Sequence, residues 1–422
     1  MSPRLRSLFV VAWLSVGATF GIGCGAKTGL YTPDGSTNAP FDAGVDAADA
    51  APDAPCLEIP FDGGPVEVDL SIEAEVGAAD IAFVIDTTAS MGDEIARIRS
   101  TLRDQMAPAI RAAIPDSRLA VATFEDFPVT NYGASMDLPY ELLQVATNDL
   151  FLVQAAVNGI GLGDGLDLPE SQVEALYQLV TGAGRGMYVS ASAGCPSGGF
   201  GSACFRNDAL PVALLFTDAE FHNGPRNANP YGSEIRPSPA TYAEMIEVAN
   251  ASGLRVIGFD STGAARRHLE TTSRDTGAVQ PDGSPLYYVI GASGERLDTS
   301  VVDAIRTLAS NFVQDVDAVI FDGDPSDGID ALELVESFVP SRAVPSNGVE
   351  RIEGNVFVGA RAGTQLFWMI TVRNDVVAPG PRPRRVRLEV VFRGDGRRRI
   401  GRPFVDLVIP GTDGGCELLE EP

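Results

Sequence analysis

Three oxygen-bearing side chains follow a short apolar run near residue 85. Residues 81–85 (IAFVI) are all apolar, and Asp86, Thr88 and Ser90 come next at alternate positions. An apolar run of this length predicts a strand buried on both faces of a sheet. A carboxylate and two hydroxyls at the carboxyl end of such a strand are hard oxygen ligands, in the place where α/β sheets bind their ligands. The spacing indicates a divalent-metal site or, alternatively, a Thr/Ser helix cap with Asp86 in a turn.

Further acidic residues follow the other predicted strands. Asp218 comes directly after an apolar run, Asp126 follows a second strand, and Asp167 and Glu170 open a helix after a glycine-rich loop. Carboxylates gathered at one edge of a sheet repel one another unless a cation lies among them. The chain has a single lysine, Lys27, and no arginine directly adjoins these acids. A divalent ion is therefore the expected counter-charge.

The elements that must position these residues alternate between strands and helices. Such alternation, from residue 80 to about residue 315, predicts an α/β fold with a doubly wound, mostly parallel sheet and helices on both faces. The predicted strands are residues 81–85, 118–124, 211–218, 254–260 and 286–290, and the predicted helices are residues 93–113, 149–158, 169–181, 239–251, 263–275 and 297–315.

Segments of a different pattern flank this region. Residues 66–76 alternate apolar and polar side chains, which predicts a half-exposed antiparallel strand. After residue 316 the sequence contains short strand-like runs separated by Gly, Pro and Asn turns, including residues 365–373, 385–392 and 404–409. This pattern is typical of a small antiparallel β-sandwich.

Together these motifs resemble the metal-ion-dependent adhesion site of von Willebrand factor A domains, and most closely the A-like domain of integrin β subunits. They are D-x-T-x-S at residues 86–90, the acidic pair at 93–94, D-L-P-E at 167–170 and T-D-A-E-F-H at 217–222. The resemblance implies a Rossmann-like fold and a central ion, Mg²⁺ or else Ca²⁺ or Mn²⁺. Its implied ligands are Asp86, Thr88, Ser90, Glu170 and Asp218. An adjacent ion would use Asp93 and Glu94, and a second flanking ion would use Asp126, Asp167 and Glu170.

The chain departs from the integrin pattern in places, and it also shares a topological feature with it. Thr88 replaces a serine but keeps the hydroxyl, and Gly165 stands where integrins have an asparagine. One flanking ligand is therefore missing unless Asp164 substitutes for it.

In integrin β subunits the A-like domain is inserted into a β-sandwich. The position of residues 66–76 before the α/β region, with the other β segments after it, implies the same insertion here.

The N-terminal residues are expected to lie outside the folded part. Residues 1–23 have the basic start, apolar core and glycine step of a secretory signal. The position of Cys24 resembles the lipidation site of a bacterial lipoprotein, which implies attachment to the membrane through an N-terminal lipid, with simple secretion as the alternative. Residues 24–55 are rich in Ala, Asp and Pro, a composition that predicts a disordered acidic tether.

Four cysteines remain if Cys24 carries a lipid, and four cysteines allow three pairings. In an oxidising compartment two disulfides are expected. A Cys195–Cys204 disulfide would close a loop rich in Gly and Ser. A Cys56–Cys416 disulfide would join the two ends of the interrupted sandwich.

One more acidic loop, residues 322–333, has a spacing like that of metal ligands. Its side chains fall at positions 1, 3, 5, 9 and 12 of an EF-hand-like calcium loop, and they are Asp322, Asp324, Ser326, Asp330 and Glu333. Asp327 stands where the turn glycine is expected, and a strand-like segment precedes the loop. An acidic linker turn is therefore the favoured interpretation.

The sequence favours a binding module over an enzyme. No Ser/His/Asp or Cys/His set is evident, and the only histidines are His222 and His268. The net charge of −26 argues against a nucleic-acid partner, which needs a basic surface. We expect a surface-tethered, metal-dependent adhesion module that binds a carboxylate of an unidentified protein ligand. The alternatives are an envelope lipoprotein whose metal is purely structural and a two-metal hydrolase.

The expected organisation has five parts, in a protein that is lipid-anchored in the bacterial cell envelope, at the outer membrane or the surface. The parts are the signal peptide at 1–23, the tether at 24–55, the first part of the sandwich at 56–79, the von Willebrand factor A-like domain at 80–316 and the remainder of the sandwich at 317–422.

Overall fold

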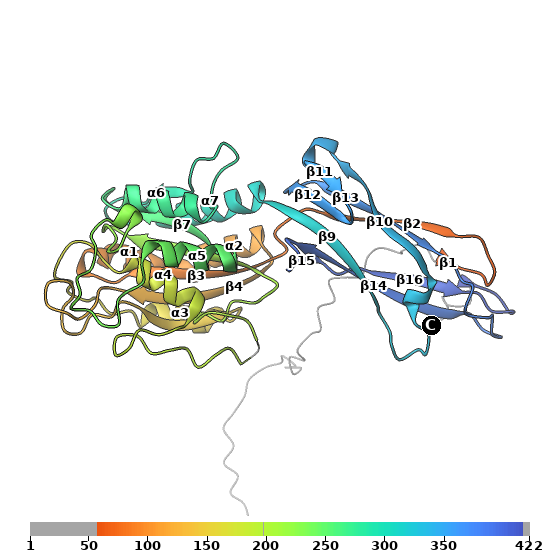
Figure 1. The fold of residues 1–422 in the computed structure, drawn as a ribbon, viewed down its shortest axis with the longest axis horizontal. Helices are drawn as coiled ribbons and strands as arrows, with labels where there is room; N and C mark the ends of the chain where they lie inside the picture. The colour runs from red at the N-terminus through yellow and green to blue at the C-terminus, as the bar shows by residue number, and fades with distance from the viewer. Residues whose placement is uncertain (1–56, 197, 417–422) are drawn as a thin grey trace, which may run out of the picture. The chain divides into compact units, whose positions relative to one another are not determined.

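The computed structural model describes residues 57–196 and 198–416 (Figure 1). The expected signal peptide and tether, with Cys24 and Cys56, lie outside the described residues. None of the helices in the described part is long and apolar enough to cross a membrane.

A six-stranded sheet occupies the middle of the α/β region, with the strand order β5-β4-β3-β6-β7-β8. All neighbouring strands in it are parallel except β4 and β5, which are antiparallel. The strands are β3 (Ala78–Asp86), β4 (Asp116–Phe124), β5 (Glu141–Thr147), β6 (Leu210–Thr217), β7 (Arg255–Asp260) and β8 (Tyr287–Val289). The predicted doubly wound, mostly parallel sheet is confirmed. The edge strand β5 was not predicted, because its half-exposed residues carry no continuous apolar run.

Helices cover both faces of this sheet (Figure 1). Along β3, Ile81, Phe83 and Ile85 face one apolar core, whereas Ala82 and Val84 face the other. The first core also contains side chains of α1 (Gly92–Thr101), α2 (Ala107–Ala113), α3 (Leu150–Asn158) and α7 (Leu297–Asn311). The second contains side chains of α4 (Gln172–Thr181), α5 (Tyr242–Ser252) and α6 (Arg266–Asp275). Burial on both faces explains why the 81–85 run is continuously apolar.

Two predicted helices differ from the observed ones. The segment 93–113 is α1 and α2 joined by the π-helical turn Leu102–Met106. Pro108 lies in the first turn of α2 and has no backbone N–H to continue a regular helix, so the wide turn falls directly before it. The helix predicted to end at residue 315 ends at Asn311, because Phe312 is extended and the chain passes into a strand that begins at Val313.

The remaining strands form two sheets packed around one apolar core. A seven-stranded sheet has the order β1-β16-β14-β9-β12-β11 with β15 paired to β14, and a three-stranded sheet has the order β10-β13-β2. Trp368 of the smaller sheet contacts Phe357 and Phe392 of the larger one. The strands are β1 (Leu57–Glu58), β2 (Val66–Glu73), β9 (Val313–Asp322), β10 (Val335–Val344), β11 (Arg351–Glu353), β12 (Val356–Arg361), β13 (Gln365–Val372), β14 (Arg384–Gly394), β15 (Arg398–Gly401) and β16 (Phe404–Ile409).

Strand pairing confirms that the α/β region is inserted into this sandwich. Strand β2, which precedes the α/β region, pairs antiparallel with β13, which follows it, over eight residues from Glu73–Gln365 to Val66–Val372. The sandwich is antiparallel throughout its named strand pairs except at β1 and β16, which are parallel.

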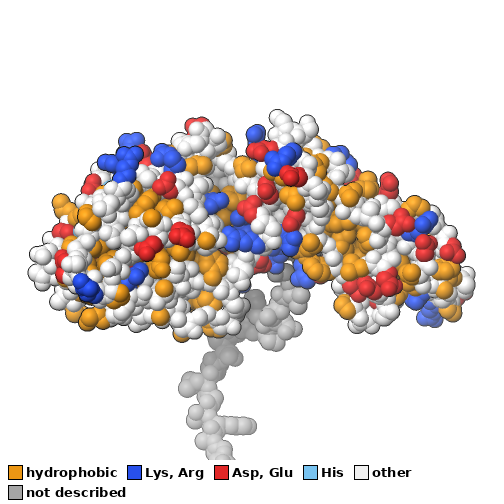
Figure 2. Space-filling view, viewed as in Figure 1, with side chains coloured by type: hydrophobic (Ala, Val, Ile, Leu, Met, Phe, Trp, Pro, Cys, Tyr) orange, Lys and Arg blue, Asp and Glu red, His pale blue; other side chains and the backbone are white. Residues whose placement is uncertain are grey.

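On the face shown in Figure 2, acidic and basic side chains are interspersed with apolar ones.

The cysteines within the described residues are disulfide-bonded. Cys195 and Cys204 form a disulfide with Cα atoms 5.4 Å apart, in the glycine-rich loop where it was expected. Cys416 is also disulfide-bonded. Its pairing with Cys56 stays a prediction because Cys56 lies outside the described residues.

Candidate metal centre

The central group of predicted ligands assembles from the ends of two neighbouring strands. Asp86 ends β3, and its Oδ1 accepts hydrogen bonds from the backbone N–H of Thr88 at 3.0 Å and from the Thr88 hydroxyl at 2.7 Å. The hydroxyls of Thr88 and Ser90 are 3.3 Å apart, and Ser90 Oγ donates to Asp218 Oδ1 at 3.1 Å. Asp218 directly follows β6. Four of the five predicted ligands therefore form one connected row of oxygen atoms.

The alternative interpretation is correct only in part: Asp86 accepts from the Thr88 N–H as a turn residue does, but the Thr88 side chain does not cap a helix. Thr88 precedes the 3₁₀ turn Ala89–Met91, but its side chain makes no capping hydrogen bond. Its hydroxyl donates to Asp86 instead. That contact keeps the oxygen of Thr88 beside the carboxylate, where both can bind one ion.

A neighbouring pair of polar residues holds the second oxygen of Asp86. Thr217 Oγ1 donates to Asp86 Oδ2 at 2.7 Å, and Gln172 Nε2 donates to Thr217 Oγ1 at 3.0 Å. Asp86 is fully buried, and burial raises its pKa to about 7 despite these donors. Thr217 belongs to the T-D-A-E-F-H motif, whereas Gln172 carries no sequence signal that separates it from other polar residues on a helix.

Glu170, the fifth predicted ligand, is a buried carboxylate near several others. Its pKa is raised to about 11 by burial and then by the charges of Asp86 and Asp126, followed by Asp167. Within the described part of the chain its Oε2 has no hydrogen-bond donor. The backbone of Glu170 pairs with the 217–222 segment, since its N–H donates to Glu220 O at 2.9 Å and its carbonyl accepts from His222 N–H at 2.8 Å. These contacts place the D-L-P-E loop beside the T-D-A-E-F-H run.

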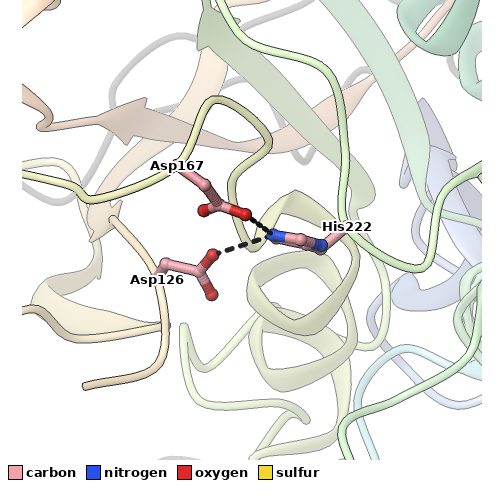
Figure 3. Close-up of side chains that lie close together, drawn as sticks. All are labelled: Asp126, Asp167 and His222. Carbon is pink, nitrogen blue, oxygen red and sulfur yellow. Dashed lines mark hydrogen bonds and ion pairs between the residues drawn. The ribbon is translucent and has the colours of Figure 1, made fainter. Parts of the chain in front are cut away.

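A second group contains Asp126, Asp167 and His222 (Figure 3). His222 Nε2 is 3.1 Å from Asp167 Oδ2 and 3.3 Å from Asp126 Oδ2. One ligand atom of each residue lies within 4.8 Å of the other two. The sequence predicted Asp126 and Asp167 at a flanking site, but it did not predict that His222 would join them. Its place at the end of the T-D-A-E-F-H run was the one available signal.

The two acidic residues at the start of α1 differ in their exposure to solvent. Glu94 is buried and Asp93 is exposed. Burial raises the pKa of Glu94, and the negative charges of Asp218 and Asp93 add to that effect. Glu94 therefore lies in the electrostatic environment of the central group, and its role as a ligand of an adjacent ion stays a prediction.

The acidic loop at 322–333 uses its side chains within the loop itself. Asp322 accepts a hydrogen bond from Asp324 N–H, and Asp324 accepts from the N–H and hydroxyl of Ser326. Asp330 caps the short 3₁₀ helix Ala331–Leu334. Across residues 57–196 and 198–416, no three carboxylates of this loop converge, since the one group of three potential His, Cys, Asp or Glu ligands is Asp126, Asp167 and His222. The hydrogen bonds within residues 322–333 favour an acidic linker turn over a calcium-binding loop.

The buried oxygens at this edge of the sheet fit a divalent ion. Among the described residues, several carboxylate oxygens are buried without a hydrogen-bond donor, and they include Glu94 Oε2, Asp126 Oδ2, Asp167 Oδ1 and Glu170 Oε2. A buried polar atom left without a partner costs about 1–3 kcal/mol, and a charged one costs more. Mutually repelling carboxylates with free lone pairs are the donor set that a hard divalent cation neutralises.

Among the comparisons with known proteins, only solved structures show a likeness to this chain. No family model matches the chain, and no curated protein matches it. The von Willebrand factor type A protein from Catenulispora acidiphila is 12% identical, with 85% of this chain and 72% of that chain covered and a TM-score of 0.37. The ArnB paralog VWA2 from Sulfolobus acidocaldarius is 10% identical, with coverages of 84% and 74% and a TM-score of 0.32.

A third solved structure is the pilus adhesin SpaC from Lactobacillus rhamnosus GG in its open conformation. It is 15% identical, with 83% of this chain but 46% of that chain covered and a TM-score of 0.32. Two of the three proteins carry the name of the family that the motifs resemble. Likeness at this level carries no conclusion about the activity of this chain.

Proposed function

We propose that this protein is a non-enzymatic, surface-tethered module that binds a partner protein through a divalent ion. The main support for this proposal is that the side chains of the central group range from fully buried to exposed. Asp86 and Glu170 are buried, Asp218 is half-buried and Ser90 is exposed. An ion held by these residues and Thr88 would have protein oxygens on its inner side and solvent on its outer side.

The ion supplies a fixed positive charge that can accept one more oxygen ligand. Mg²⁺ commonly keeps water in its coordination sphere, and a partner carboxylate can replace such a water. Mg²⁺ is the proposed ion, with Ca²⁺ and Mn²⁺ as alternatives. The residues of this chain hold the ion, screen it from the buried side and leave its outer side accessible.

Large apolar side chains are exposed on the neighbouring loops. Leu162 is 54% exposed and Leu168 is 86% exposed. Leu168 lies within the D-L-P-E loop, and a Cβ built at Gly92, the first residue of α1, would lie 3.4 Å from Leu162 Cδ1. Exposed apolar side chains around a charged centre support a protein partner, because they can bury area that a small anion does not offer.

Water relaxation on bound Mn²⁺ tests whether the ion has an accessible coordination position. Mn²⁺ bound to the full-length protein should enhance the relaxation of water protons, because exchangeable water stays on the ion. N-acetyl-aspartate amide at millimolar concentration should reduce the enhancement, and the uncharged asparagine analogue is the matched control. Asp218→Ala should remove the part of the enhancement that N-acetyl-aspartate amide suppresses. If Mn²⁺ binds without enhancement, its site is closed by protein oxygens, and the purely structural role replaces this proposal.

We also propose attachment to the cell envelope through a lipid on Cys24. The signal-like residues 1–23 and the acidic composition of residues 24–55 support this location. Mass spectrometry of protein extracted from membranes should find an N-terminal peptide that begins at acylated Cys24. A mature N-terminus at another residue without lipid would indicate secretion instead.

A further inference from the structure

Four arginines line a cleft of about 480 Å³ beside the start of α6. Arg266, Arg267 and Arg274 belong to α6, and Arg226 belongs to the 3₁₀ turn Pro225–Asn227, which packs against that helix. In Figure 2, basic side chains gather over the position that α6 has in Figure 1. Because the whole chain has a net charge of −26, this cleft is a basic site on an acidic protein.

Three of these four arginines have no acidic partner. In the described part of the chain, the side chains of Arg226, Arg267 and Arg274 form no ion pair or hydrogen bond, and all three residues are exposed. Arg266 is paired with Glu270, with Nε 2.8 Å from Oε1. Arg267 and Arg274 are seven residues apart, which places them on one face of the helix about 10.5 Å apart along its axis. The cleft therefore carries positive charge that nothing on its walls compensates.

The start of α6 adds hydrogen-bond donors to the same cleft. Its N-cap residue, Ala265, has no side chain that can accept from the first N–H groups of the helix, and the first turn contains no acidic residue. Arg266 and Arg267 occupy that turn, although the helix dipole disfavours cations at this end. A bound anion would accept from the free N–H groups and compensate the two arginines.

Contacts behind the cleft hold its two walls together. His268 lies on the buried side of α6, and its Nδ1 accepts a hydrogen bond from Phe221 N–H at 2.8 Å. Gly224 is so close to the same ring that a Cβ added there would be 3.1 Å from His268 Nδ1. These contacts fix the turn that carries Arg226 against α6. Both walls are therefore in position without a ligand.

We propose that this cleft binds the phosphate groups of a phosphorylated sugar, either free or as a unit of a glycan. The planar fork of an arginine binds phosphate through two parallel hydrogen bonds. Each phosphate carries up to two negative charges, so two of them compensate the three unpaired arginines. The inference goes beyond the proposed function, because it requires no metal ion and rests on other residues.

The rest of the lining favours a sugar over a lipid or a protein as the carrier of the phosphates. Glu270 and the Thr271 hydroxyl lie in the cleft and can accept hydrogen bonds from sugar hydroxyls. Among the described residues, the lining includes no large exposed apolar side chain. Such side chains would be needed to contact acyl chains or to form the apolar centre of a protein interface.

Calorimetric titration of metal-free full-length protein with fructose 1,6-bisphosphate tests this site. The ligand carries a phosphate at each end, and it should bind in a chelator-free buffer of low ionic strength. Glucarate carries carboxylates at the same two ends and about half the charge, so it should bind at least about tenfold more weakly. Fructose should not bind. Equal binding of glucarate, or no binding of the bisphosphate at millimolar concentration, would overturn the inference.

Single substitutions assign the binding to the cleft. Arg226→Gln and Arg267→Gln should each weaken it by at least about tenfold, because each removes charge-assisted hydrogen bonds. Glu270→Gln should strengthen it, since the change removes a negative charge and frees Arg266. Arg306→Gln is the matched control, because Arg306 is an exposed arginine of α7 that forms no ion pair within the described residues and lies outside this cleft. Unchanged binding in both Arg226→Gln and Arg267→Gln would also overturn the inference.

Vesicles distinguish a sugar phosphate from a lipid headgroup. Addition of phosphatidic acid to phosphatidylcholine vesicles should not raise the fraction of protein that sediments with them. Retention that requires both phosphatidic acid and Arg267 would overturn the assignment to a sugar. Because the titration uses metal-free protein, neither result depends on the ion at the central group, and the proposed function can fail or stand separately.

Discussion

Asp86→Asn should abolish Mg²⁺ binding at the central site while the protein stays folded. Asp86 is the most buried ligand, and it accepts hydrogen bonds from Thr88 of the same group and from the neighbouring Thr217. Asparagine keeps the shape and the acceptor oxygen for Thr88, but it removes the negative charge. Loss of one charge from a buried ion pair costs about 3–5 kcal/mol, which corresponds to a more than 100-fold weaker affinity.

Isothermal titration calorimetry with Mg²⁺ measures this effect, and the neighbouring strand provides a matched control. Asp260 ends β7 and is also fully buried, but its oxygens already accept from Thr262 N–H, Gly263 N–H and the Tyr287 hydroxyl. Asp260→Asn should therefore leave the Mg²⁺ affinity nearly unchanged. Equal binding by wild-type protein and Asp86→Asn would show that the ion lies elsewhere.

In EDTA, the free energy of unfolding should fall as the pH rises from about 5 to 8. The pKa of Glu170 rises from its ordinary 4.5 to about 11 on folding, and that of Asp86 rises from 3.8 to about 7. A carboxyl group with a raised pKa favours the folded state below its unfolded pKa, and this contribution is lost as the pH rises toward the folded pKa. For Glu170 the loss between pH 4.5 and 7 is on the order of 3 kcal/mol.

Mg²⁺ should remove most of this pH dependence, because the bound ion compensates the charges that proton loss creates. Thermal or urea unfolding at pH 5, 6, 7 and 8, with EDTA or Mg²⁺, measures the slopes. Glu170→Gln should flatten the slope in EDTA and raise stability at pH 8. The control Glu234→Gln alters an exposed group whose pKa is lowered by the Tyr132 hydroxyl, so it should not flatten the slope. A flat slope in EDTA for the wild-type protein would contradict the raised pKa of Glu170, because the carboxyl group would then be ionised in both the folded and the unfolded state.

The local pattern of the chain was sufficient to predict five of the six strands of the parallel sheet and the place of Asp86 and Asp218 at the ends of two of them. The run at 81–85 is apolar because both faces of β3 are covered. An apolar run of this kind can be recognised from adjacent residues of the sequence alone. Asp86 is the last residue of β3, and Asp218 comes directly after β6. Parallel strands place their carboxyl ends at one edge, so strand prediction was enough to bring these two residues together.

Only the tertiary structure decided what happens in the loops and at the sheet edge. Strand β5 pairs antiparallel to β4 although its sequence shows no period of its own. The helix predicted to reach residue 315 ends at Asn311, because β9 finds a partner strand in the sandwich from Val313 onward. Both outcomes depend on a partner distant in sequence, which no local periodicity encodes.

The second group of ligands shows the same distinction most clearly. Asp126, Asp167 and His222 come from three irregular segments, and each segment is shaped by contacts with another, such as the Glu170 carbonyl with His222 N–H and the Tyr231 hydroxyl with Asp126. The sequence by itself determined that acidic residues would gather at the carboxyl edge of a parallel sheet. Tertiary packing decided that a histidine would stand among them, because loop conformation is set by hydrogen bonds between distant residues and not by the spacing along the chain.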